Sequence, residues 1–125
     1  MDLTREQAIK EHRKLWNWIA DETIGQEIKV EKWEYFSLFK FIQPIHACYC
    51  CEYAKNVCMS KSEDFSMGKR CQYCPIEWGE ESYNQCVSEE ITNSYYSLWE
   101  ECKSYNYIIA ANLARLIAEL PEREI

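Results

Sequence analysis

The sequence predicts a mainly α-helical protein: a small helical domain with a four-cysteine zinc-knuckle insert between N-terminal helices and a long C-terminal helix. Apolar residues make up 47% of the 125 residues, with only three Gly and three Pro, a composition typical of a compact helical fold. Apolar residues recur at helical spacing near both ends of the chain, whereas cysteines gather in the middle, where that spacing is lost. We expect one domain over 1–125, with helices in 1–44, zinc binding in 45–92 and a helix over 93–121.

The first helix is predicted over 5–23. Thr4 and Gln7 have the spacing of a capping box, in which each side chain binds the backbone N–H of the other residue. Gly25 is expected to end the helix. Apolar residues that recur at near-helical intervals support the assignment: Ala8, Ile9, Leu15, Trp16 and Ile19.

A second helix is predicted over 27–42, in EIKVEKWEYFSLFKFI, and Pro44 is expected to end it. Its high aromatic content leaves a β-strand as the alternative. The apolar positions that define the pattern are Val30, Trp33, Phe36, Leu38, Phe39 and Ile42.

The last helix is predicted over 93–121, with Asn93 or Ser94 as its N-cap and Pro121 as its end. Its apolar stripe would pack on the other helices of this chain or on a second copy, so a homo-oligomer is an expected state. The stripe consists of Tyr95, Leu98, Trp99, Cys102, Tyr105, Ile109, Leu113, Leu116 and Ile117.

Two C-x2-C pairs separated by nineteen residues predict a structural zinc site. Two residues between thiols allow a tight turn that brings both sulfurs within about 2.3 Å of one ion, and two such turns complete a tetrahedral shell. Four thiolates leave no position for water or substrate, so the ion would order the chain and not catalyse. Cys86 or Cys58 could replace one ligand, and His46 is a further candidate. The predicted zinc ligands are Cys48, Cys51, Cys71 and Cys74.

Three other interpretations of the cysteines compete with zinc binding. Redox-active pairs are disfavoured because the βαβ context of a thioredoxin-like motif is missing. Cys50 and Cys102 fit the pattern of small buried apolar residues. Disulfides are disfavoured because the charged N-terminus lacks the apolar core of a secretory signal, so we expect a cytoplasmic protein in a reducing environment.

No apolar run approaches the ~20 residues that span a bilayer, so no membrane association is expected.

The net charge of −7 argues against nucleic-acid binding, which draws most of its affinity from basic side chains. Catalysis is also not expected, because His12 and His46 are the only histidines and no catalytic motif is present. The acidic second half is typical of a solvated face, and the alternative interpretation is an acidic surface that binds a basic protein partner. Aromatic residues that could anchor such an interface are Trp16, Trp18, Trp78, Tyr95 and Trp99.

Two alternative functions remain. The aromatic residues could stack on a nucleotide signal that the protein sequesters, with Arg13, Arg70 or Arg115 contacting its phosphates. A weaker alternative is a zinc module that binds nucleic acid despite the negative charge.

Four segments together resemble a family of small uncharacterised proteins encoded by bacteriophages and prophages of Firmicutes. They are REQAIKEHRKLWNWIADET, CYCCEYA, CQYCPIEW and YYSLW, which cover about a third of the chain. The family has no assigned activity. The resemblance implies a non-structural phage accessory protein, for which inhibition of a host anti-phage defence protein is an expected role.

Overall fold

The computed structural model describes residues 3–38, 49–61, 73–77 and 95–123, except the side chain of Cys51. Within these residues the secondary structure is helical, apart from one isolated antiparallel bridge between Ile76 and Glu122. The prediction of a mainly α-helical fold is confirmed. The helices are α1 (Arg5–Gln26), α2 (Lys32–Leu38), α3 (Tyr49–Ser60), α5 (Tyr95–Glu101) and α6 (Tyr107–Ala118).

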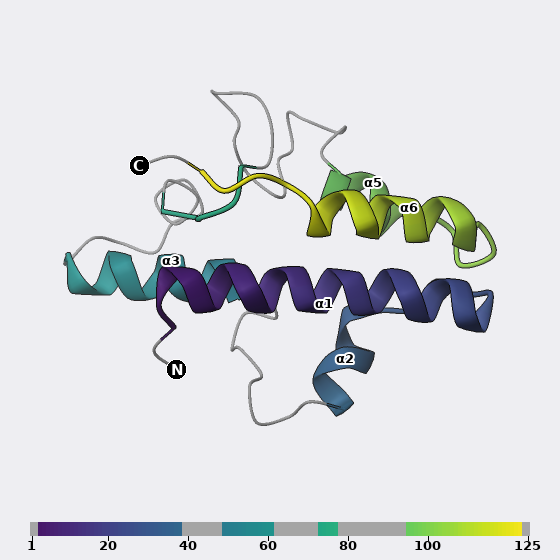
Figure 1. Ribbon diagram of the computed structural model, residues 1–125, viewed down its shortest axis with the longest axis horizontal. Helices are drawn as coiled ribbons and strands as arrows, with labels where there is room; N and C mark the ends of the chain where they lie inside the picture. The colour runs from purple at the N-terminus through teal and green to yellow at the C-terminus, as the bar shows by residue number, and fades with distance from the viewer. Residues whose placement is uncertain (1–2, 39–48, 62–72, 78–94, 124–125) are drawn as a thin grey trace.

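Helix α1 is the axis on which the other described helices pack (Figure 1). It contacts α2, α3 and α6, while α5 packs against α6. In Figure 1, α5 and α6 lie on one side of α1 and α2 lies on the other, and α3 runs beside the N-terminal half of α1. Helix α6 runs antiparallel to α1, so the last helix returns along the first.

The start of α1 follows the prediction, whereas its end does not. The backbone N–H of Gln7 donates to Thr4 Oγ1 at 3.1 Å and that of Thr4 donates to Gln7 Oε1 at 2.9 Å, which completes the capping box. Gly25 does not end the helix. Instead Glu27 adopts the left-handed conformation at φ 55° and serves as the C-cap, at a cost of about 1 kcal/mol for a non-glycine residue.

The core between α1 and α6 is built on small side chains. Ile117 and four alanines of α6 are buried there, so the two helix backbones can approach closely. Large residues fill the space beside this contact, where Trp16 meets Trp99 edge to face at 4.8 Å between ring centroids. The alanines are Ala110, Ala111, Ala114 and Ala118.

The predicted helix over 93–121 is two helices, because the chain turns at 102–106. Lys29 supplies the reason. Its ammonium donates to the carbonyls of Glu100 and Cys102 at 3.1 and 3.3 Å and lies 4.3 Å from the Trp99 ring centroid. The carbonyls that a continuous helix would bond internally are therefore satisfied by a buried cation from a distant segment.

The end of α6 is held by α1 in a similar way. His12 Nε2 donates to the carbonyl of Ile117 at 3.0 Å, and the Arg13 guanidinium donates to that of Ala118 at 2.9 Å. Two donors from neighbouring residues of α1 thus bind the last carbonyls of α6. Both His12 and the carbonyl that it binds are enclosed in the core.

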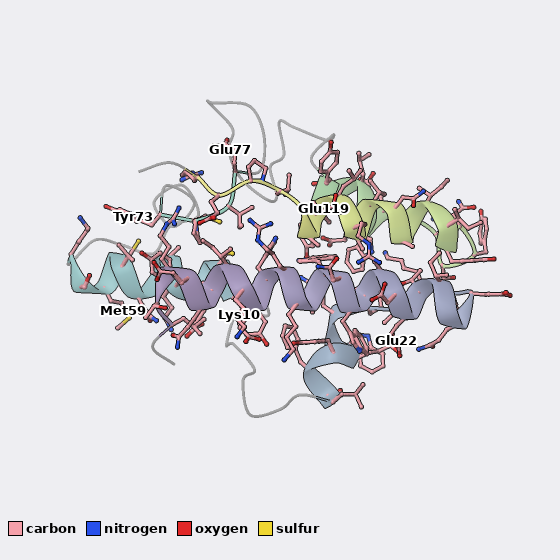
Figure 2. All side chains as sticks on the ribbon, viewed as in Figure 1. Lys10, Glu22, Met59, Tyr73, Glu77 and Glu119 are labelled. Atoms are coloured by element: carbon pink, nitrogen blue, oxygen red, sulfur yellow. The ribbon has the colours of Figure 1, made fainter. Side chains whose placement is uncertain are left out.

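The segment after α6 pairs with the segment that contains Cys74. The N–H of Glu77 donates to the carbonyl of Pro121 at 2.9 Å, and that of Arg123 donates to the carbonyl of Pro75 at 2.7 Å. Figure 2 shows the labelled Glu77 and Glu119 on the α6 side of α1 and Glu22 on the α2 side. This pairing fixes Cys74 in the core, beside the end of the last helix.

Two predictions for the middle of the chain need correction. The region 45–92 was expected to be irregular, yet it contains α3, whose buried residues include Cys50, Ala54 and Cys58. Cys50, predicted as a small buried apolar residue, and Cys58, predicted as a substitute ligand, both belong to the buried stripe of this helix. Of the predicted helix over 27–42, the structure describes residues 27–38, and the helix within them is α2, which begins at Lys32.

Candidate metal-binding corner and interaction surfaces

Two of the four predicted zinc ligands fall within the described residues. Cys51 lies in the first turn of α3, and Cys74 is buried in the paired segment 73–77. Cys48 and Cys71 lie outside the described residues, as do His46 and Cys86. Among the residues that can be described, no group of three or more His, Cys, Asp or Glu side chains could hold a metal. The four-cysteine site therefore remains a prediction.

Helical geometry restricts which cysteines can share an ion with Cys51. Cys58 lies seven residues further along α3, so the two Cα atoms are separated by about 10.5 Å. Two thiolates that share one zinc at about 2.3 Å must place their sulfurs within about 4.6 Å of each other. A site that includes Cys51 therefore excludes Cys58, which is buried in α3 instead. Cys50, also buried, agrees with its interpretation as a small apolar residue.

Polar groups without hydrogen-bond partners are buried where α3 meets α1. Glu52 and the Tyr49 side chain are almost wholly buried, and neither Glu52 Oε2 nor the Tyr49 hydroxyl has a partner at hydrogen-bonding geometry. The same holds for Glu11 Oε2 on α1. Burying a polar oxygen in this way costs about 1–3 kcal/mol. The packing of α3 is thus less favourable than its apolar residues alone would indicate.

Two tyrosines respond to this environment. Burial raises the pKa of Tyr35 to about 12, and the nearby Glu11 carboxylate adds to the effect. Burial also raises the pKa of Tyr49, with further contributions from Tyr35 and Glu11. Both phenols therefore stay protonated at neutral pH and are poor general bases.

His12 is equally unsuited to catalysis. Burial lowers its pKa to about 4, despite its hydrogen bond to the Ile117 carbonyl, and the neighbouring Arg13 adds to the decrease. The ring is neutral at pH 7 and its Nε2 proton is committed to the backbone of α6. His46, the other histidine, lies outside the described residues.

The predicted aromatic anchors fall into different environments. Trp16 and Trp99 are buried in the core and are not available to a partner in this conformation. Trp18 is half-buried and packs against Tyr35 at 5.4 Å between ring centroids. Tyr95 is partly exposed, and Trp78 lies outside the described residues.

The most exposed tryptophan in the described part of the chain is not among the predicted aromatic anchors. Trp33 on α2 is 67% exposed. Its exposure could have been inferred from the adjacent sequence, because Glu31 and Lys32 precede Trp33 and Glu34 follows it. A core-facing residue is rarely flanked by charges on both sides. Leu38, at the end of the same helix, is also exposed.

The lysines near Trp33 reach toward α5, and the Lys29 ammonium also forms an ion pair with Glu31 at 3.7 Å between Nζ and Oε1. Lys29 is buried against Trp99, and the Lys32 ammonium donates to the Tyr96 hydroxyl at 2.6 Å and lies 4.6 Å from its ring centroid. Glu31 and Glu34 remain half-buried beside Trp33, with Glu34 accepting from the N–H of Glu31 at 2.8 Å. We refer to Glu31, Trp33, Glu34 and Leu38 as the α2 surface.

Two of the three arginines proposed as phosphate contacts have other partners. Arg13 binds the Ala118 carbonyl. Arg115 binds both Asn17 and Asp21 of α1. Arg70 lies outside the described residues. A nucleotide would have to displace these intramolecular contacts.

Comparisons with known proteins give no assignment. No family model, no curated protein and no solved structure matches the chain. No helix in the described ranges combines the length and the apolar character needed to cross a membrane.

Proposed function

We propose that this protein is a non-catalytic binding protein that uses the α2 surface to bind a basic protein partner, and that a structural zinc ion orders its cysteine-rich region. The observation that carries the binding function is Trp33. It is exposed beside Glu34, and the nearby lysines bind groups of α5, with Lys29 also paired with Glu31, so Glu34 is the carboxylate next to Trp33 that can meet a basic partner. Exposed tryptophans at the centre of polar surfaces are frequent hot spots of protein interfaces.

The absence of catalysis is supported by the chemistry of the described titratable groups. His12, Tyr35 and Tyr49 have pKa values shifted away from neutrality by burial, and each of these groups lies in the core. A general base needs a pKa near the working pH and access to substrate. These three residues have neither.

The resemblance to phage proteins makes a bacterial host protein the expected partner, with inhibition of an anti-phage defence protein as the role. An acidic surface can occupy the groove of a nucleic-acid-binding host protein by matching its positive charge. Such binding would weaken as salt screens the charges.

The test is a binding measurement with a host protein recovered at stoichiometric amounts. Trp33→Ala should weaken binding by at least about tenfold, because truncation of a hot spot costs about 2 kcal/mol or more. Tyr105→Ala is the matched control, since Tyr105 is an exposed aromatic residue on the α6 side of the molecule. Equal affinity for Trp33→Ala and wild type would refute the proposal.

The zinc proposal concerns Cys48, Cys51, Cys71 and Cys74. Thiolates are the donors that structural zinc prefers, and Cys74 is buried on a segment fixed by two backbone hydrogen bonds. Elemental analysis of protein purified without added metal should give one zinc per chain. Cys51→Ser and Cys74→Ser should lower this value and Cys102→Ser should not; a metal-free native protein would refute the site.

The two alternatives gain no support from the described residues. Arg13 and Arg115 are engaged with α6 and α1, which disfavours phosphate contacts, and the charge of −7 disfavours nucleic acid. A thermal-shift panel of nucleotides should therefore leave the melting temperature unchanged.

A further inference from the structure

Helix α6 is apolar on the side that faces away from α1 as well as on the side that packs against it. Arg115 is the one charged residue among its twelve, and its guanidinium binds Asn17 and Asp21 of α1. A helix without charges on its outward side is normally covered on that side too. Among the described elements, α1 and α5 contact α6.

The outward side carries several large apolar side chains that are exposed to solvent. Tyr105, just before the helix, is 75% exposed, and Ile108, Ile109 and Leu116 are 57%, 55% and 42% exposed. Asn112 lies on the same side, between the isoleucines and the leucine. We call these five residues the α6 outer face.

Two further isoleucines are exposed at the C-terminal end of α1, one in its last turns and one just after it. Ile24 and Ile28 are exposed near the end of α1, and the N–H of Lys29 donates to the carbonyl of Ser104 at 3.1 Å, which brings that end beside the turn before α6. With the large residues of the α6 outer face, this makes six apolar side chains that are 42–75% exposed. Large exposed apolar surfaces mark interaction sites.

We propose that the α6 outer face is the contact between two copies of this chain in a symmetric dimer. The geometry fits this occupant, because the exposed apolar residues from Ile108 to Leu116 lie on one side of α6 over about 12 Å at ~1.5 Å per residue, a stripe along which the same helix of a second copy can pack. Charge fits as well. A chain with a net charge of −7 repels its own copy, and no carboxylate lies in the sequence between Tyr105 and Leu116.

Two-fold symmetry defines which residues meet. If the helices pair antiparallel about Asn112, residues equally spaced from it on either side face each other. Ile108 of one copy then meets Leu116 of the other, and the two Asn112 amides can hydrogen-bond across the axis. Glu119 of each copy lies opposite Tyr105, whose hydroxyl can donate to the carboxylate. A central asparagine pair costs some affinity but fixes register and orientation.

The proposal is independent of the partner-binding surface. Trp33 and Leu38 lie on α2, on the opposite side of α1 from α6 (Figure 1). The dimer proposal can therefore be refuted while the partner-binding proposal is supported, and partner binding can be refuted while the dimer is supported.

The test is sedimentation equilibrium of the full-length protein from about 5 µM to about 500 µM, a range that brackets the weak affinity expected for a small interface. The wild type should reach twice the monomer mass within it. Ile108→Glu and Leu116→Glu should each weaken association by at least about 100-fold, because a buried symmetric pair of carboxylates is costly. Leu38→Glu, an exposed leucine on α2, is the control and should associate like the wild type.

Asn112→Leu gives a test in the opposite direction. Removing the polar pair should tighten the dimer about tenfold, whereas a solvent-exposed asparagine would give no change. Circular dichroism confirms that each variant is folded. A monomer at all concentrations, or a dimer that persists in both glutamate variants, overturns the proposal; the first result would leave this face to another segment of the chain or to a different protein.

Discussion

The two flanks of α1 differ in how their buried polar groups are satisfied. On the flank of α5 and α6, Lys29 binds carbonyls at the end of α5, and His12 and Arg13 bind those of α6. The Trp99 indole N–H and the Arg123 Nε atom are the exceptions. Where α3 packs, oxygens of Glu11, Tyr49 and Glu52 are buried without partners. The first flank is stabilised by side chains that are all present in the described chain. The second needs a further stabilising contribution, and a metal ion is our proposed source.

The sharpest test of the first flank is Lys29→Met. The methionine keeps the apolar stem of lysine but leaves the Glu100 and Cys102 carbonyls without their donor and removes the contact with Trp99. We expect a loss of about 4 kcal/mol in the free energy of unfolding, measured in urea. Lys103→Met, at an exposed lysine of the same turn, should change it by less than about 0.5 kcal/mol. Equal values for the two variants would show that Lys29 does not stabilise the turn.

The second prediction uses pH. The pKa of His12 is about 4 in the folded protein and 6.5 in the unfolded chain, so the unfolded state binds more protons between these values. Stability should fall as pH decreases from about 6.5 to about 4, by about 3 kcal/mol in total. His12 contributes no pH dependence above this window, where the ring is neutral in both states.

Carboxylates also titrate in the lower part of that window, so the measurement is a difference. His12→Gln keeps an N–H donor for the Ile117 carbonyl but does not titrate. Urea unfolding of both proteins at several pH values should show a steeper loss for the wild type. Parallel pH profiles would mean that His12 is protonated or exposed in the native protein.

The third prediction concerns the small side chains between α1 and α6. Ala114 is fully buried in this contact, and Ala114→Leu should destabilise the protein by about 2 kcal/mol because the helices would have to move apart. Asn112→Leu adds a leucine on the outward side of the same helix. At low protein concentration, where association is negligible, it should change the free energy of unfolding by less than about 0.5 kcal/mol.

The smallest expected effect has the opposite sign and tests the second flank. Tyr49→Phe removes a buried hydroxyl that interacts with the neighbouring Tyr35 phenol but has no partner at good hydrogen-bonding geometry, so the variant should be as stable as the wild type or up to about 1 kcal/mol more stable. A loss of more than about 1 kcal/mol in chemical denaturation would show that this hydroxyl is bonded and that the contrast between the flanks is wrong.

The parts of the fold that could be predicted are those specified by local sequence. The capping box of Thr4 and Gln7 placed the start of α1 correctly, and helical periodicity identified the overall class. The break at 102–106 could not be predicted, because it depends on Lys29, which is more than seventy residues away in sequence and whose role appears only when α5 is packed. The prediction that a stripe of large apolar residues packs the last helix was wrong in part, for a related reason. Close packing on α1 favours alanines, so Ile109 and Leu116 point outward.

For the candidate sites too, local sequence specifies some features and three-dimensional packing decides the others. The spacing of the cysteines suggested four zinc ligands in an irregular region. This interpretation missed α3, in which Cys50 and Cys58 belong to a buried helical stripe. Aromatic content suggested binding residues, but two of the tryptophans, Trp16 and Trp99, form the core. Trp33 could have been selected from the charged residues on both sides of it. The contacts of the nearby lysines with α5 depend on three-dimensional packing and could not be predicted.

The pairing of the first and last helices has a consequence for the rate of folding. Residues 27–106 lie between α1 and α6, so the largest helix contact of the described chain forms only after a long loop has closed. Helical proteins with mostly local contacts fold in microseconds to milliseconds, and this topology should be slower. Arg5 also binds the Glu122 carboxylate and the Arg123 carbonyl, which brings the outermost described residues together. A circular permutant that joins these ends and opens the chain at 102–106 would make α6 and α1 neighbours in sequence, and its refolding should be faster.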